Sequence, residues 1–407
     1  MSNQELERVE TGKDLWEDEC DEDTPEEEAN EEEVRPANIF HVGRFFLVLC
    51  YVAYCGDFPQ RMIYRIGGFS EWTRKVTYRA LEEGYLLEWH GEFNKHKVDS
   101  LRISAKGLDY IAGKSPEVFA QIAAQRDTRN PRTRLNAQGI VRSHALASVL
   151  VIAQNAGALV IAKDKPSLMY DEMMRSKRPI DPQQPYFYTS HEIRRALQEK
   201  APELTFKGSQ LAGVIVQGED SYFLYFAGSR RIYWMRPTEE NYVGAIQSLL
   251  NVRGFSIRTV RQVVIGNRMT TAKKHYKRRN RRAKPYFVLS EFFNNCYFVT
   301  NNDEGDAQLH IMIHEDLMRE ASEKALAGCR IPERKLRGYD AIEESSGRPV
   351  LLNFAFDMLP LETAYMAGEV LGKDPIVLCF DDQVEVMQSM VEPQVEIRGI
   401  GSAKDYA

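Results

Sequence analysis

The first 36 residues constrain the fold most, because their composition excludes them from any packed core. They hold 16 acidic and 3 basic side chains, a balance of -13. A segment this charged and this poor in apolar residues buries too little surface to offset the entropy lost on folding. The sequence therefore predicts a disordered acidic tail over residues 1–36. Since the whole chain carries -6, residues 37–407 carry +7, and the part that folds is basic.

The body of the chain has the composition of an ordinary globular protein. Apolar residues make up 43% of the sequence, enough for the cores of two or three domains. The longest apolar run, residues 45–55, is much shorter than the ~20 residues of a bilayer-spanning helix, so we expect no membrane segment. The six cysteines form no Cys-x-x-Cys pair, which indicates reduced thiols. These features predict a cytoplasmic protein.

Residues 37–115 carry helix and strand signals in an order typical of a DNA-binding module. The patterns predict three helices, two strands and a last helix: residues 43–55, 59–66, 71–83, 86–90, 98–104 and 105–112. Gly84 is suited to ending the third helix, and Ser104 to capping the last one. This order predicts a winged helix-turn-helix, in which the third helix enters the major groove and the hairpin contacts the backbone.

The third helix of this module holds the first group of candidate DNA-binding residues. Val76, Ala80 and Leu81 are predicted to face the core. The residues predicted to be more exposed are Thr73, Arg74, Lys75, Thr77, Tyr78 and Arg79. The tip of the hairpin adds Lys95, His96 and Lys97. Arg74 can pair bidentately with a guanine, and the lysines can neutralise phosphates. The alternative is a winged helix that contacts another protein, with these charges simply solvated.

A second group lies in residues 273–284, which hold eight lysines or arginines and no acid. Like charges at this density repel one another, so a polyanionic partner is expected to offset them. We predict a nucleic-acid arm that includes Lys273, Lys274, Lys277, Arg278, Arg279, Arg281 and Arg282. The same pattern would suit a nuclear localisation signal in a eukaryotic host, and a solvated loop is the plain alternative.

The rest of the chain is predicted to be a helical linker region with a proline-rich loop over residues 116–190 and an α/β domain over residues 191–407. In the second region, apolar runs typical of buried strands alternate with helical patterns: residues 211–216, 222–226, 262–265, 309–313, 350–354 and 376–380. This alternation favours a partly parallel sheet covered on both faces. The fold class we expect is α+β or α/β, with several domains.

Few residues suggest catalysis. His310 and His314 fall in a run predicted to be a strand, where residues four apart lie about 13 Å from each other, too far for one metal. Asp381 and Asp382 follow a predicted strand, at a carboxyl end where sites often form. Neither a phosphate-binding loop nor a Gly-x-Ser-x-Gly turn is present. We predict no catalytic residues, no metal and no cofactor.

The order of these parts resembles the replication-relaxation proteins of plasmids and conjugative elements. It combines a winged helix that has an arginine in its third helix, a helical segment with Ser143-His144-Ala145, and an α/β domain, over residues 40–250. The resemblance implies a non-catalytic DNA-binding protein of a mobile element. Such a protein would act in plasmid replication, relaxation or mobilisation, or in transcriptional regulation of those genes, and its partner would be double-stranded DNA.

The resemblance also implies an α/β domain similar to a nuclease fold. That fold uses a carboxylate on one strand and an acid-x-Lys pair on the next, whereas residues 211–216 and 222–226 carry no acid and no lysine. We therefore expect a degenerate version, with Ser229, Arg230 and Arg231 suited to holding a phosphate. The alternatives are a divergent metal-dependent nuclease that uses Asp381 and Asp382, and a scaffold that bridges DNA to a conjugation protein through residues 191–407. A homodimer stays open.

Overall fold

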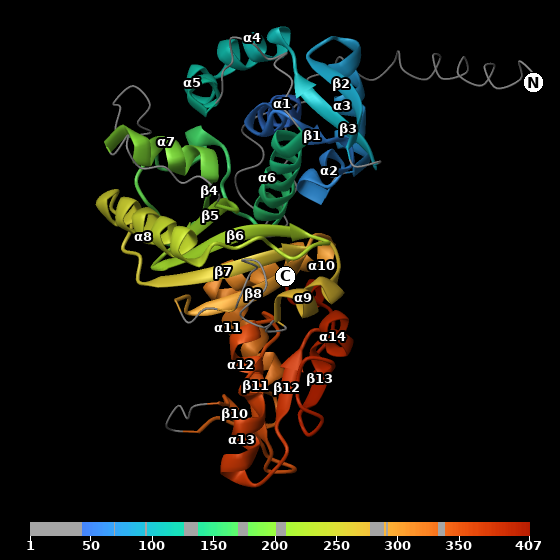
Figure 1. The fold of residues 1–407 in the computed structure, drawn as a ribbon, viewed down its shortest axis with the longest axis vertical. Coiled ribbons are helices and arrows are strands. Elements are labelled where there is room, and N and C mark those ends of the chain that lie inside the picture. The colour runs from blue at the N-terminus through green and yellow to red at the C-terminus, as the bar shows by residue number, and fades with distance from the viewer. Residues whose placement is uncertain are drawn as a thin grey trace, which may run out of the picture. The chain divides into compact units, whose positions relative to one another are not determined.

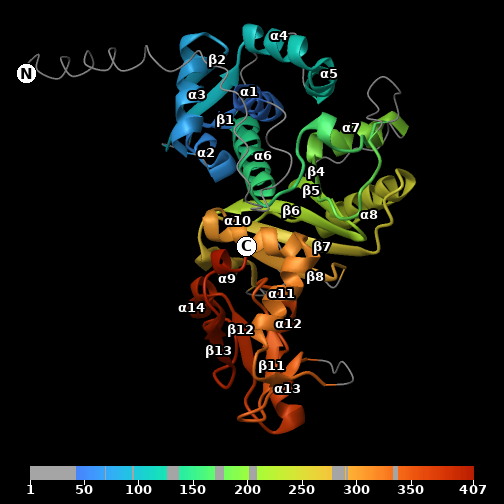
Figure 2. The same ribbon diagram turned by 180° about the vertical axis from the view of Figure 1, so that it is seen from behind.

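The protein is described by a computed structural model, which covers nine stretches of the chain. These are residues 43–68, 70–93, 96–125, 137–169, 178–200, 209–276, 289, 292–332 and 338–407. Within them the chain is a mixed α/β protein with three sheets and 14 α-helices (Figures 1 and 2). Residues 38–407 form one compact unit. The predicted acidic tail lies outside the described residues. No described helix is long and apolar enough to cross a membrane.

The N-terminal segment contains a small antiparallel sheet with the strand order β1-β3-β2. Its elements are α1 (Arg44–Cys55), β1 (Phe58–Pro59), α2 (Gln60–Ile63), α3 (Ser70–Glu82), β2 (Leu86–Phe93), β3 (His96–Ile103) and α4 (Ala105–Lys114). The predicted stops and caps are confirmed. Gly84 has a φ of 73°, which favours glycine, and the Ser104 hydroxyl accepts the Gly107 N–H at 3.0 Å.

The helix predicted over residues 59–66 is confirmed only over residues 60–63. Pro59 instead pairs with Ser100 in β1, and α2 ends at Ile63. A short 3-10 turn, Ile66–Gly68, follows, in which Gly67 has a φ of 66°. An edge strand accepts a proline because the missing N–H would not join the ladder, so Pro59 can end β1 directly before α2 begins at Gln60.

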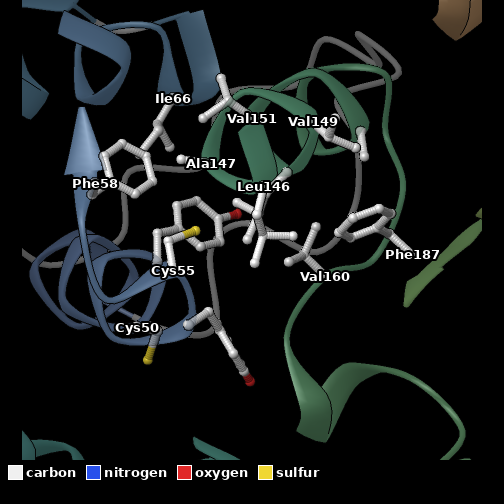
Figure 3. Close-up of a cluster of buried hydrophobic side chains, with 14 of the residues drawn as sticks. Cys50, Cys55, Phe58, Ile66, Leu146, Ala147, Val149, Val151, Val160 and Phe187 are labelled. Carbon is white, nitrogen blue, oxygen red and sulfur yellow. The ribbon is translucent and has the colours of Figure 1, made fainter. Parts of the chain in front are cut away.

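The core is organised around α6 (Ala137–Asn155), a helix that is buried on several sides. Val149, Leu150, Val151 and Ile152 are each 0% exposed. The helix packs against α1 and β1 on one side and against three strands of the central sheet on the other. Figure 3 shows its side chains beside Phe58 of the N-terminal segment and near Phe187 of the central sheet. One continuous core therefore joins these two parts of the chain.

The central sheet has the strand order β4-β5-β6-β7-β8. The strands are β4 (Tyr186–Thr189), β5 (Leu211–Gln217), β6 (Asp220–Gly228), β7 (Thr259–Gly266) and β8 (Asn295–Thr300). The strand β5 runs antiparallel to its neighbours β4 and β6, and β6, β7 and β8 run parallel. The prediction of a partly parallel sheet is confirmed. The sequence predicted neither β8 nor β4, since residues 186–189 fall within the region 116–190 that was expected to be a helical linker with a proline-rich loop.

Helices cover both faces of this sheet, as expected. The covering helices are α6, α7 (Ser190–Lys200), α8 (Arg236–Val252) and α10 (Asp303–Ile313), and the chain here also forms α5 (Pro116–Gln125) and α9 (Ala272–Tyr276). Alternate strand residues show the two sides: Leu224 joins the core cluster of α6, whereas Phe223 joins that of α8. The helices α6 and α10 thus lie on one face, and α7 and α8 on the other.

The strand predicted over residues 309–313 is wrong, because these residues form the end of α10. Asn302 caps this helix by accepting the Gly305 N–H at 3.0 Å, and acidic residues occupy its first turn, where the helix dipole favours them. Leu309, Ile311 and Ile313 are all buried. A short apolar run that is buried all round has no period that separates a strand from a helix.

A second sheet follows, with the order β13-β12-β11-β10-β9. Its strands are β9 (Cys329–Arg330), β10 (Ala341–Glu343), β11 (Pro349–Leu352), β12 (Ile376–Cys379) and β13 (Glu396–Gly399), and the helices are α11 (Glu315–Ala325), α12 (Met358–Leu361), α13 (Ala364–Leu371) and α14 (Val384–Gln388). Residues 191–407, predicted as one α/β domain, therefore contribute to two sheets.

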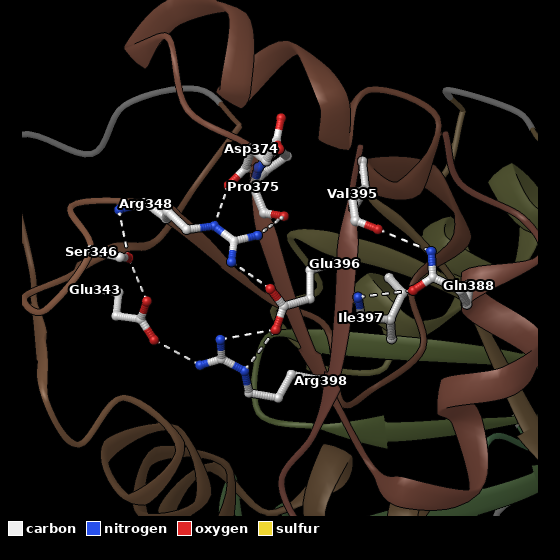
Figure 4. Close-up of polar contacts among 10 residues, drawn as sticks. All are labelled: Glu343, Ser346, Arg348, Asp374, Pro375, Gln388, Val395, Glu396, Ile397 and Arg398. Atoms are coloured by element: carbon white, nitrogen blue, oxygen red, sulfur yellow. Dashed lines mark hydrogen bonds and ion pairs between the residues drawn. The ribbon is translucent and has the colours of Figure 1, made fainter. Parts of the chain in front are cut away.

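Ion pairs link the outer strand β13 to β10 in this sheet (Figure 4). Arg398 contacts Glu343 at 2.7 Å and Glu396 at 2.9 Å, and Arg348 pairs with Glu396 as well. These cations hold the pKa of the Glu396 carboxyl below its usual value. All of these groups are partly exposed, so the pairs orient the strands more than they stabilise the fold.

The continuous core predicts a large penalty for cutting a side chain in α6. We expect Val151→Ala to lower the free energy of unfolding by about 2 kcal/mol, because it leaves a cavity where no water can enter. The same substitution at Val141, which lies in α6 but is 48% exposed, is the matched control and should change the free energy by less than about 0.5 kcal/mol. Urea unfolding followed by circular dichroism measures both. Equal losses for the two variants would contradict the packing described for α6.

Candidate nucleic-acid interface

One face of α3 carries exposed basic and aromatic side chains. Arg74 and Lys75 are exposed, and Tyr78 is 47% exposed. The guanidinium of Arg74 lies over the Tyr78 ring, 5.6 Å from its centre. This contact partly orders a side chain that would otherwise be free to rotate. On the opposite side Val76 and Ala80 are buried, as predicted.

The expectation that Thr73 and Thr77 are exposed is wrong. They are 4% and 2% exposed, because positions 73, 77 and 80 share one face of the helix with Val76. The Thr77 hydroxyl donates to the Thr73 carbonyl at 2.7 Å, which satisfies it inside the protein. Neither threonine can reach a base, so both leave the candidate set. Their burial fixes which face of α3 points outward.

Arg79 is exposed but already has a partner. Its Nε lies 2.7 Å from the Glu83 carboxylate, in an i,i+4 pair on the helix surface. A phosphate would have to compete with that carboxylate. Arg79 is therefore a weaker candidate than Arg74, whose partner is an uncharged ring.

The hairpin between β2 and β3 is longer than predicted, so its tip is shorter. The register pairs Phe93 with His96 and Glu92 with Lys97, which makes His96 and Lys97 strand residues. The expectation that they belong to the tip is wrong. Lys95 and the side chains of His96 and Lys97 lie outside what the structure describes.

Acidic residues flank this hairpin further down. His90 Nδ1 lies 2.8 Å from Asp99, and Glu88 lies 3.6 Å from its other nitrogen. The hydrogen bond to Asp99 raises the pKa of His90, although the ring is fully exposed. These carboxylates would repel a phosphate, so contact with an anion is favoured near the tip rather than at the base of the hairpin.

Buried contacts fix the N-terminal sheet to the rest of the protein. Arg102 of β3 pairs with the buried carboxylate of Asp57 at 2.5 Å. His144 of α6 forms a 2.8 Å hydrogen bond with Ser100. Burial lowers the pKa of His144 to about 4. The imidazole is therefore neutral at pH 7 and holds β3 against α6.

The second candidate group begins on α9. Lys273 and Lys274 are described, and Lys274 Nζ donates to the Ser229 carbonyl at 2.7 Å. His275 is buried, accepts the Ile232 N–H through Nε2 at 3.2 Å and donates from Nδ1 to the Thr271 carbonyl at 3.1 Å. Burial lowers its pKa to about 4. The other members of the predicted arm lie outside the described residues: Lys277, Arg278, Arg279, Arg281 and Arg282.

The histidines at 310 and 314 are much closer than predicted. Because this segment is a helix and not a strand, the centres of the two rings lie only 4.3 Å apart. Each Nδ1 donates to a backbone carbonyl, of Ala156 and of His310 respectively. Among the residues that the structure describes, no three His, Cys, Asp or Glu side chains are grouped to hold a metal ion.

The acids named for a nuclease are engaged in structural contacts. Asp381 accepts the Gly401 N–H at 3.1 Å, beyond the end of β12. Burial, and then the nearby Glu304 carboxylate, raises the pKa of Asp382. Asp220, which begins β6 before the predicted strand, pairs with Arg261 at 2.8 Å. No observation on these side chains favours metal-dependent cleavage.

Comparison with known proteins does not identify the chain. No protein-family model, curated protein or solved structure matches it. The resemblance to replication-relaxation proteins therefore stays a prediction. The case for a nucleic-acid interface depends on the geometry and charge of the residues described above.

Sequence reasoning missed polar residues that the central sheet gathers at one edge. Asn267 and Arg268 follow β7, and Asn301 follows β8. Their signal was a glycine and a polar residue at the end of a buried strand, which occurs as Gly228-Ser229 and again as Gly266-Asn267. Parallel pairing brings these strand ends together. The sequence alone does not show which strands pair, so it does not predict that these residues are neighbours.

The two buried histidines predict a loss of stability in mild acid. Each has a pKa of about 4 when folded, against about 6.5 in an unfolded chain. The unfolded chain therefore takes up protons first, and stability that is complete above pH 6.5 falls as the pH drops towards 4. Between pH 7 and pH 5 each histidine should cost about 2 kcal/mol of unfolding free energy.

Urea unfolding at both pH values tests this expectation. His275→Gln should reduce the loss between pH 7 and pH 5. His90→Gln is the control, because the pKa of His90 is shifted in the opposite direction and its removal should not reduce the loss. An unchanged pH dependence in His275→Gln would show that folding does not lower the pKa of this ring.

Proposed function

We propose that this protein binds double-stranded DNA through residues 43–114, folded as a winged helix-turn-helix. The order α1-β1-α2-α3-β2-β3-α4 and the sheet order β1-β3-β2 support this assignment. In such a module α3 is the recognition helix, and the hairpin of β2 and β3 is the wing. The function proposed is that of a non-catalytic protein of a mobile element, in plasmid replication, relaxation or mobilisation, or in regulation of those genes.

The exposed face of α3 is the observation that carries the proposal. It presents Arg74, Lys75 and Tyr78 to solvent, while Thr73 and Thr77 lock the opposite face into the core. The helix therefore offers a fixed surface on a rigid support, which is what readout of base edges requires.

The two cations have different roles in this proposal. Arg74 is planar and held over Tyr78, so it suits bidentate contact with the O6 and N7 atoms of a guanine. Lys75 is a flexible point charge and suits a phosphate. The hairpin adds contacts to the backbone through residues near its tip. Specificity would then reside in α3, and part of the affinity in the hairpin.

The charge of the chain supports the same partner. Residues 37–407 carry +7, whereas the overall charge of -6 reflects the acidic N-terminal residues. A basic body attracts a polyanion over the distance of a Debye length, about 10 Å at 0.1 M salt.

The second sheet, with its partly exposed ion pairs, is proposed to bind a protein partner of the same genetic element.

The proposal predicts that Arg74→Ala plus Lys75→Ala weakens duplex binding. We expect the affinity for the selected site to fall about 10- to 100-fold, because one base contact and one phosphate contact are lost. The slope of log K against log salt should become shallower by about 1. Fluorescence anisotropy with a labelled duplex, first selected from a random pool by the wild-type protein, measures both.

The matched control removes two exposed cations of α11, Arg319→Ala plus Lys324→Ala. Arg319 and Lys324 are exposed, and the control removes the same positive charge as the α3 variant. If net charge alone governed affinity, the two variants would bind equally weakly. Binding by this control should match that of the wild type. Wild-type affinity in the α3 variant would contradict the recognition-helix assignment. An absence of duplex binding by the wild type at low salt would contradict it as well.

A further inference from the structure

The carboxyl ends of three parallel strands meet at one edge of the central sheet. The strands β6, β7 and β8 end at Gly228, Gly266 and Thr300. A polar residue follows each of them: Ser229, Asn267 and Asn301. Ligands of open α/β sheets bind outside the carboxyl ends of parallel strands, because the side chains and loops there converge. This edge is therefore a candidate for a second binding site.

The polar side chains form a continuous row along the edge. Asn267 Nδ2 lies 3.4 Å from Ser229 Oγ, and Asn301 Nδ2 lies 3.4 Å from Asn267 Oδ1. The row continues into the N-terminal segment, since Arg65 donates to Asn301 Oδ1 at 2.6 Å. The sheet edge and the segment that contains α3 therefore meet at Arg65. Ser229 and Asn267 are exposed.

Several cations surround this row without carboxylate partners. Arg230 and Arg268 are exposed, and neither pairs with an acid within the described ranges. Lys274 donates to a backbone carbonyl instead. The neighbouring acids already face Arg65, since Asp306 lies 2.7 Å and Asp303 3.9 Å from its nitrogens. Within the described ranges, the charge of Arg230 and Arg268 is therefore not offset by an ion pair.

The loops that carry these groups are fixed by backbone contacts. Asn267 N–H donates to the Gly228 carbonyl and Asn301 N–H to the Gly266 carbonyl, each at 2.7 Å. Gly266 packs so tightly that a Cβ atom there would lie 2.5 Å from the Phe298 ring. His275 holds the next loop by accepting the Ile232 N–H. A ligand would therefore meet groups that are already placed and lose little entropy in ordering them.

We propose that this edge is a second DNA-backbone site, in which Arg230 and Arg268 bind phosphates of the same duplex that α3 contacts. Ser229 and Asn267 add hydrogen-bond donors to phosphate oxygens. Separate cations on different loops match the repeated charges of a polyanion better than one phosphate group. The inference rests on the proposed function for the identity of the polymer, but its residues are distinct from those of α3.

Two duplex lengths and one double variant test the second site. Arg230→Ala plus Arg268→Ala should reduce affinity for a duplex of about 25 base pairs and lower its salt slope by about 2, because two phosphate contacts are lost. A duplex of about 10 base pairs centred on the α3 site should lose less affinity than the long duplex, since it offers fewer phosphates beyond that site. The control is again Arg319→Ala plus Lys324→Ala, which should bind the long duplex like the wild type.

The outcomes separate this inference from the proposed function. Wild-type affinity and salt slope of the edge variant on the long duplex overturn the second site, whatever α3 does. An effect of the edge variant without any effect of Arg74→Ala plus Lys75→Ala would support the second site and contradict the recognition helix. Replacing both edge arginines by glutamate should weaken binding further, and an equal affinity would also count against the site.

Discussion

The burial of α6 is the constraint on which the rest of the structure depends. Its residues Val149 to Ile152 have no exposed surface, so the helix must be covered on both sides. The N-terminal segment covers one side, and β5 and β6 cover the other. Neither part buries its own apolar surface without α6. The candidate DNA-binding segment is therefore a fixed part of a larger core.

A polar contact reinforces this union where the apolar core ends. Asn155, at the end of α6, donates to both the Arg65 carbonyl and the Asp306 carboxylate, and Arg65 also binds Asp306. Burial raises the pKa of Asp306, although Arg65 opposes that shift. Truncating Asn155 would leave buried polar groups without partners, which costs more than the bonds themselves contribute. The same arginine begins the row of polar side chains at the sheet edge, so one residue serves the core and the proposed second site.

Local patterns in the sequence were enough to predict most elements of the N-terminal segment. Caps and glycines such as Ser104 and Gly84 act within one turn, so their effects do not depend on tertiary contacts. The sequence failed where burial overrides periodicity, as at residues 309–313, and where polar residues join an apolar stripe, as at Thr73 and Thr77. The sheet edge was out of reach because residues 229, 267 and 301 become neighbours only when β6, β7 and β8 pair in parallel.

The central claim is that one duplex contacts both α3 and the carboxyl edge of the central sheet. Amide hydrogen exchange of the full chain, with and without a duplex of about 25 base pairs, tests it most directly, because slowed exchange reports contact at each segment. The account predicts slower exchange in α3, where β2 ends and β3 begins, and in residues 228–232 and 266–268. It predicts no change in α11. Protection confined to the second sheet, or absent from both α3 and the edge, would contradict it.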